Sequence, residues 1–206
     1  MVVLTRNAVP QADFDKISET VLSLYDLNKK VNDYWNSTSA SLPVVYPEWE
    51  AEIGRDALEK AMSRDTPKNK VYTKARKDHF STLLNQKSAQ RYSRINDILS
   101  RTYGEVILGT PSRFYNPTDY MGWHTNYESP GARIYVIWST GNESSFFRYY
   151  DREKDEIITD YDDKGLTIRE FNVTHSDPLW HCVGCIKEHR LSMGFRKRNE
   201  TRYHNQ

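Results

Sequence analysis

The stretch ARIYVIWSTGNESSFFRYY, residues 132–150, decides the fold of the second half of the chain. Two runs rich in β-branched and aromatic residues, 132–139 and 144–150, lie on either side of the turn signal Gly141-Asn142. Runs of this length and composition, separated by turn residues, are typical of β-strands. The stretch therefore predicts two short strands with a turn between them.

The same pattern continues on both sides of this stretch. Six further β-rich runs lie between turn residues, at 105–109, 112–115, 156–161, 166–173, 178–183 and 190–196. About eight short strands at such regular spacing favour a β-sandwich or a jelly roll. We therefore expect residues 104–197 to form the β-rich core of the protein.

Before residue 104 the apolar residues recur at steps of three and four. This period runs from Asp13 to Tyr34, from Pro47 to Met62 and from about Lys77 to Ser100, and it predicts three amphipathic helices. We expect residues 1–103 to form a helical layer of the same domain, packed on one sheet of an α+β fold. Residues 198–206 are expected to form a basic tail.

Composition excludes several classes of protein. The 206 residues carry 29 Lys and Arg against 28 Asp and Glu, so the net charge of +1 gives no overall field for nucleic acids or membranes. No apolar run approaches the roughly 20 residues that span a bilayer, and the first residues lack the apolar stretch of a signal peptide. The apolar fraction is only 37%, but 13% of the residues are aromatic and can supply a core. We expect a cytoplasmic protein that binds no membrane.

Charge is nevertheless uneven along the chain. Residues 60–101 contain eleven Lys or Arg and three Asp or Glu. This basic stretch is interpreted either as the solvated face of a helix with its flanking loop or as a patch for a polyanion such as nucleic acid. Tyr72 and Tyr92 are the only aromatic residues within it that we expect to stack on bases, which favours the first interpretation.

Side chains that can carry chemistry gather in the β-rich half. His124 and Asn126 are two positions apart, as are Arg190 and Ser192, and residues with this spacing share one face of a strand. His181 lies 57 residues after His124 and nine before Arg190. Imidazoles bind transition metals. A guanidinium and a hydroxyl on one face suit a carboxylate.

This arrangement resembles the non-haem iron(II), 2-oxoglutarate-dependent dioxygenases, in which two histidines and a carboxylate hold the metal. The shared pattern is His-x-(acid), a long gap, a second His, and then Arg-x-Ser. Four segments of the chain are similar to strands and turns of that family: Phe114–Pro117, Gly122–His124, Pro130–Tyr135 and Ser145–Phe147. The resemblance covers about residues 104–197 and implies a double-stranded β-helix, which is a form of jelly roll.

The resemblance also implies a role for each site residue. Three residues would bind iron(II): His124, Asn126 and His181. Four would bind 2-oxoglutarate: Arg190, Ser192, Tyr135 and Tyr115. The implied reaction converts 2-oxoglutarate to succinate and CO2 and oxidises a C–H bond of an unidentified substrate, with ascorbate as the expected reductant.

Asn126 departs from the family pattern, because an amide brings no negative charge to the metal. Three interpretations stay open. The amide is a weak ligand in a working enzyme, or a carboxylate such as Glu128 or Asp119 replaces it directly or through water. In the third interpretation the fold is retained and catalysis is lost. The protein would then be a binding or structural assembly protein.

The cysteines suggest a different kind of site. Cys182 and Cys185 form a C-x-x-C pair that, with His181 and His189, offers four zinc ligands within nine residues. A redox dithiol is the other alternative. Both are disfavoured, because the chain has no second cysteine pair and because His181 and Cys182 face opposite sides of a strand. His175 is a weaker candidate for the second iron ligand, because its surroundings are turn-like.

Overall fold

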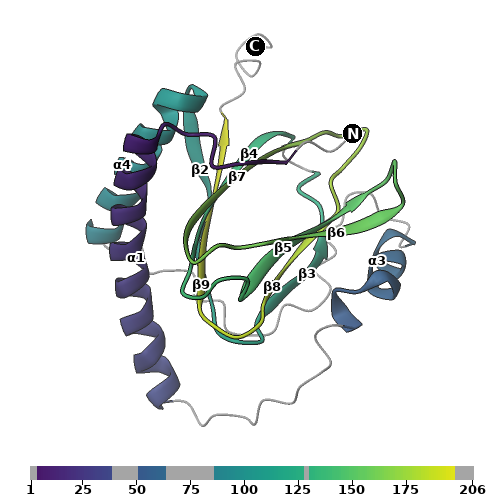
Figure 1. Ribbon diagram of the computed structural model, residues 1–206, viewed down its shortest axis with the longest axis horizontal. Coiled ribbons are helices and arrows are strands. Elements are labelled where there is room, and N and C mark those ends of the chain that lie inside the picture. The colour runs from purple at the N-terminus through teal and green to yellow at the C-terminus, as the bar shows by residue number, and fades with distance from the viewer. Residues whose placement is uncertain (1–3, 39–50, 64–85, 128–129, 198–206) are drawn as a thin grey trace, which may run out of the picture.

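Two antiparallel β-sheets form the centre of the molecule (Figure 1). The computed structural model describes residues 4–38, 51–63, 86–127 and 130–197. The large sheet has the strand order β1-β7-β4-β9-β2 and the small sheet the order β3-β8-β5-β6. From β2 to β9 the chain passes back and forth between the two sheets, which is the winding of a jelly roll. The predicted α+β fold with a double-stranded β-helix is confirmed.

The strands have the following bounds. The large sheet contains β1 (Thr5–Arg6), β7 (Gly165–Val173), β4 (Gly131–Ser139), β9 (Arg190–Lys197) and β2 (Val106–Tyr115). The small sheet contains β3 (Tyr120–His124), β8 (His181–Cys185), β5 (Ser145–Asp151) and β6 (Glu156–Tyr161).

Two helices, α1 (Gln11–Thr38) and α4 (Gln86–Tyr103), cover the outer face of the large sheet (Figure 1). Their apolar stripes form one buried core with the sheet, in which Ile17 and Leu24 of α1 pack with Ile134 of β4. The expected helical layer on one sheet is therefore present for these two helices. The first part of the helix expected from Lys77 lies outside the described residues. In the described part of the chain, no helix is long and apolar enough to span a membrane.

The third helix lies on the other sheet. Leu58 and Ala61 of α3 (Arg55–Met62) are buried against Trp123 and Phe146 of the small sheet. The turn before α3 is attached to the same sheet, because the indole Nε1 of Trp123 donates to the Gly54 carbonyl at 3.0 Å. The expectation that all helices before residue 104 pack on one sheet is therefore wrong for α3, because the apolar period of a helix does not determine which sheet its apolar face meets.

Strand limits also differ from the sequence pattern. The runs at 105–109 and 112–115 form one strand, β2, with register irregularities between Leu108 and Arg113. The predicted strand at 178–183 is shifted from the observed one, because β8 starts at His181 and continues to Cys185. Strand β1 was not predicted, since two residues are too few to show a period. It pairs with β7 at the edge of the large sheet.

The inner faces of the two sheets enclose the space in which the candidate site lies. Along β4, Ile134 and Val136 face the helices, so the alternation of a strand turns Arg133 and Tyr135 inward. Aromatic residues of both sheets, among them Phe147 and Phe171, pack around Tyr135. The interior is thus an aromatic core at one side and a cavity at the other.

Candidate active site

The two candidate metal-binding imidazoles lie side by side in the small sheet. His124 ends β3 and His181 begins β8, and the two residues are partners in the antiparallel register. Their ring centroids are 4.2 Å apart. Strand pairing thus brings together two residues that are 57 positions apart in the sequence.

Backbone carbonyls orient both rings in the same way. Nδ1 of His124 lies 2.8 Å from the Gly122 carbonyl oxygen, and Nδ1 of His181 lies 2.9 Å from that of Leu179. Each Nδ1–H therefore donates to the backbone, which leaves each Nε2 as the acceptor nitrogen of its ring. Histidines that bind metals typically donate their other ring N–H to a carbonyl or carboxylate in the same way.

Both imidazoles are neutral at physiological pH. Burial lowers the pKa of His124 to about 4, and the positive charge of Arg113 adds to this effect. Burial and the neighbouring His124 lower the pKa of His181 well below its usual value. A metal ion therefore does not need to displace a proton from either ring.

Asn126 reaches this pair from outside the strand. Because β3 ends at His124, the period-two argument that placed His124 and Asn126 on one face of a strand is wrong. The Asn126 amide nevertheless lies at the pair. Its Nδ2 donates to the Tyr135 hydroxyl at 3.0 Å and lies 3.4 Å from Nε2 of His181. A half turn of the amide presents Oδ1, a metal ligand, at the same place.

The described residues contain no carboxylate at the imidazole pair. No group of three His, Cys, Asp or Glu residues within the described ranges could hold a metal ion. Asp119 is buried in the β2–β3 connection, where its carboxylate accepts a hydrogen bond from the backbone N–H of Asn116 at 2.7 Å. It does not line the cavity. This position contradicts the interpretation that Asp119 replaces Asn126. Glu128 lies outside the described residues.

A cavity of about 580 Å³, including its opening to solvent, joins the imidazoles to the predicted cosubstrate residues. Its lining residues are Arg113, Tyr115, Met121, His124, Asn126, Tyr135, His181, Val183, Arg190, Ser192, Met193 and Gly194. All seven predicted site residues are therefore part of one cavity wall. The lining carries two guanidinium groups and no carboxylate, so the cavity suits an anion.

Arg190 is fully buried at the end of the cavity formed by β2 and β9. Its guanidinium lies over the ring of Tyr115, with 5.3 Å from Cζ to the ring centroid. Nε donates to Oδ2 of Asp162 at 2.9 Å, whereas the buried Nη1 has no hydrogen-bond partner among the described residues. An unpaired buried donor is costly, so a ligand carboxylate at Nη1 would satisfy it.

Asp162 was not predicted as part of the site. It follows β6, in a stretch of the sequence that contains several acidic residues. Instead its side chain is fully buried and pairs with Arg190 of β9 and Arg169 of β7. Ser145 also donates to it, at 2.5 Å. Burial opposes ionisation, but the two guanidiniums lower the pKa of Asp162 to about 2.

Comparisons with known proteins give distant matches of fold. No family model and no curated protein sequence matches the chain. One solved structure, an oxidoreductase of the 2OG-Fe(II) oxygenase family from Burkholderia pseudomallei, matches with a TM-score of 0.40 and 12% identity. That match covers 56% of this chain and 60% of the other.

A second solved structure, a Pseudomonas putida prolyl-4-hydroxylase, matches with a TM-score of 0.38 and 12% identity. This match covers 59% of this chain and 71% of the other. The present chain therefore spans less than two thirds of the Burkholderia protein that it matches. The assignment of the fold in this chain follows from its own strand order.

The competing zinc site is not formed. Cys182 packs with Trp123 and Phe146 on the outer face of the small sheet, opposite His181. His189 packs against Phe114, 5.5 Å between ring centroids. The four proposed ligands therefore do not converge. Both cysteines are free and buried, and burial raises the pKa of each thiol, which disfavours a reactive dithiol.

The structure also separates His175 from the imidazole pair. His175 is exposed and lies edge-on to Tyr127, 4.9 Å between ring centroids. It does not line the cavity. Most of the basic stretch that was considered for polyanion binding, residues 64–85, lies outside the described residues.

Arg113 is a lining residue that sequence analysis missed. It stands on β2, where its register partner on β9 is Ser192. The available signal was its position two residues before Tyr115, which places both side chains on one face of the strand.

Proposed function

We propose that the protein is a non-haem iron(II) oxygenase that uses 2-oxoglutarate as cosubstrate. One observation supports this most: two neutral imidazoles and an amide stand at one end of a cavity whose other end holds a buried guanidinium with a free donor. The imidazoles and the amide suit an iron ion at one end of the cavity, and the guanidinium suits a carboxylate of a diacid at the other end.

His124, Asn126 and His181 would bind the metal through Nε2, Oδ1 and Nε2. When bound, iron(II) with 2-oxoglutarate and dioxygen supplies the oxidising power for C–H oxidation. The carbonyls of Gly122 and Leu179 hold the two rings in place through Nδ1. The protein thereby fixes the ligand geometry before the metal arrives.

At the other end, Nη1 of Arg190 would donate to the far carboxylate of 2-oxoglutarate. Asp162 holds the guanidinium from the opposite side through Nε, so Nη1 keeps a fixed position. The hydroxyls of Tyr115 and Ser192 stand beside it in the cavity wall and can donate to the same carboxylate. Tyr135 supports Asn126 through its hydroxyl.

The test is formation of succinate from 2-oxoglutarate by the purified protein with iron(II) and ascorbate under air. We expect slow turnover without added substrate, and loss of turnover in His181→Ala. His175→Ala, which changes an exposed histidine outside the cavity, is the matched control and keeps the activity. The proposal is wrong if neither the natural protein nor Asn126→Asp forms succinate or binds 2-oxoglutarate.

A second candidate is a barrel that has lost catalysis and acts as a binding or assembly protein. Two observations favour it: the amide of Asn126 brings no charge to the metal, and Asp162 already neutralises Arg190. Co-purification with a stoichiometric partner and without metal would support this function. Salt-sensitive nucleic-acid binding that is weakened by Lys70→Glu and Lys74→Glu would identify the basic stretch as the contact.

A further inference from the structure

Arg113 and Arg190 belong to one patch on the inner face of the large sheet. Arg113 pairs with Ser192, and Tyr115 pairs with Arg190, across the β2–β9 ladder. The two members of each strand are two positions apart, so all four side chains face the same side. All four line the cavity. Arg113 and Arg190 are diagonal neighbours, a separation that long side chains can bridge.

The two guanidiniums differ in how their charge is balanced. Arg190 is fully buried and ion-paired with Asp162. Arg113 is half-buried on the edge strand, and the described part of the chain offers it no ion-pair or hydrogen-bond partner. The cavity therefore has an excess positive charge, and that charge is on Arg113.

The charge of Arg113 acts along most of the cavity. It lowers the pKa of His124 at the imidazole end, and it opposes the burial-induced rise in the pKa of Tyr115 at the other end. It also acts on Tyr135, which supports Asn126. Arg113 lines the same cavity as His124 at the imidazole end and Arg190 at the other end.

We propose that Arg113 is a second anion-binding residue and that the cavity binds a dicarboxylate between Arg190 and Arg113 without a metal ion. The identity of that diacid as 2-oxoglutarate rests on the proposed function. One carboxylate accepts from Nη1 of Arg190, and the other faces the guanidinium of Arg113. Because the cavity lining in the described residues carries no carboxylate, the diacid would supply an anion at the imidazole end when a metal enters.

The experiment measures 2-oxoglutarate and succinate binding to the metal-free protein by isothermal titration calorimetry in the presence of a chelator. We expect binding of both diacids by the natural protein, and much weaker binding of butyrate, the matched monoacid. Arg113→Ala should weaken diacid binding by roughly tenfold or more, because it removes a charge-assisted contact. Arg113→Lys, which keeps the charge but not the fork, should bind with intermediate affinity.

Arg94→Ala is the matched control, because Arg94 is an exposed arginine on α4, away from the cavity. It should bind diacids as the natural protein does. Melting temperatures of all variants establish that they are folded, and Arg113→Lys tests the proposal even if the alanine variant is destabilised.

Two results would overturn the inference: Arg113→Ala and Arg113→Lys binding diacids with unchanged affinity, or natural protein that binds them only after a metal is added. The proposed function fails separately, by absence of succinate formation with iron. Metal-free diacid binding that depends on Arg113, without any turnover, would keep the inference and reject the oxygenase. If the Arg113 variants form succinate and bind diacids without metal as the natural protein does, the oxygenase is supported and the inference about Arg113 is rejected.

Discussion

Asn126 decides the charge at the imidazole end of the cavity. Its amide contacts His181 and Tyr135, so an aspartate at this position would place a carboxylate at the same point. The chain would then present two imidazoles and one anion to a divalent ion. The position of the side chain, and not only its presence in the sequence, makes this substitution informative.

We predict that Asn126→Asp tightens the binding of iron(II), or of Co²⁺ as a stable probe, by roughly tenfold or more, because ligand charge strengthens metal binding. Metal titrations of the natural protein and the variant check this. Asn172→Asp makes the same chemical change at an exposed position of β7 and should leave the affinity unchanged. Equal affinities in all three proteins would show that Asn126 does not face the metal.

Asp162 is the second residue whose environment sets its behaviour. Its folded pKa is about 2, because Arg190 and Arg169 outweigh the effect of burial. An unfolded aspartate titrates at about 3.9. As the pH falls, the unfolded chain takes up this proton first. The contribution of Asp162 to stability is therefore complete above about pH 4 and is lost as the pH falls toward about 2.

We predict that this loss amounts to about 2 kcal/mol between pH 4 and pH 2, from linkage. Urea unfolding at a series of pH values measures it. In Asp162→Asn the free energy of unfolding should depend less steeply on pH in this range. Asp177→Asn, at an exposed aspartate, should keep the slope of the natural protein. A slope that Asp162→Asn leaves unchanged would contradict the assigned pKa.

At the scale of elements, β8 is held tightly between its neighbours in the small sheet. Gly184 pairs with Tyr120 of β3 and Phe146 of β5. A Cβ at this glycine would lie 2.4 Å from Cζ of the Phe146 ring, which is itself buried. Position 184 of β8, three residues after His181, therefore has no room for a side chain.

We predict that Gly184→Ala destabilises the protein by about 1–3 kcal/mol, because the ring of Phe146 must move within a packed core. Denaturant unfolding measures this. At Gly109 of β2 a Cβ would make only ordinary contacts, the nearest at 3.6 Å, so Gly109→Ala is the matched control and should change stability little. Similar losses in both variants would show that the β8–β5 contact does not limit this position.

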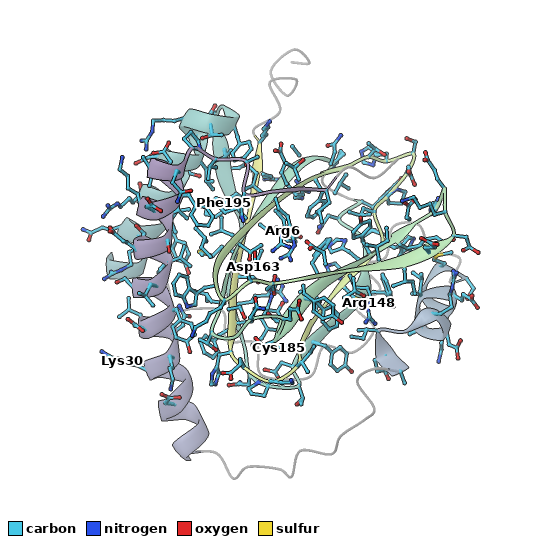
Figure 2. All side chains as sticks on the ribbon, in the orientation of Figure 1. Arg6, Lys30, Arg148, Asp163, Cys185 and Phe195 are labelled. Atoms are coloured by element: carbon cyan, nitrogen blue, oxygen red, sulfur yellow. The ribbon has the colours of Figure 1, made fainter. Side chains whose placement is uncertain are left out.

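The helices and strands also show which structural features the sequence pattern predicts. The aromatic and β-branched runs predict most strands, since alternation is a local property. The apolar stripe of α3 predicts a helix, but the sheet on which it lies depends on Trp123 and Arg148, which donate to the carbonyls of Gly54 and Ile53. Figure 2 shows Arg148 on the side of the sheets near α3. Those contacts join residues far apart in the sequence, so no local period encodes them.

At the scale of the whole molecule, a network of ion pairs closes the barrel between its two sheets. Arg169 of β7 contacts Asp160 of β6 at 2.5 Å and also contacts Asp162. Arg6 of β1 extends the network to Asp160 and Asp163, and Figure 2 shows Arg6 and Asp163 close together. The network therefore connects the N-terminal strand to the cavity through Arg190.

We predict that Arg169→Met destabilises the protein by about 3–5 kcal/mol, because it removes one of the two guanidinium partners of the buried Asp162 and one of the two partners of Asp160. Arg152→Met removes an exposed pair with Asp177 and should cost less than about 1 kcal/mol. Thermal and denaturant unfolding of both variants test the difference. Equal losses would mean that burial does not set the strength of the network.

The sequence by itself determined the β-rich core, the helices before it and the spacing that places His124, His181 and Arg190 in one cavity. Strand period, turn residues and short motifs are local, and strands of a jelly roll pair in a regular order, so these features can be predicted from the chain alone. The sequence also predicts Asn126 as a site residue, but the strand period used for that prediction does not apply, because β3 ends at His124.

Only the tertiary structure decided the charges inside the cavity. Asp162 is one of several acidic residues in a polar segment, and Arg113 is one of many arginines, so neither stands out in the sequence. Their roles arise because β6 approaches β9 and β2 pairs with β9, which brings a carboxylate behind Arg190 and a guanidinium beside it. Electrostatic interactions act through space, whereas sequence patterns describe distance along the chain.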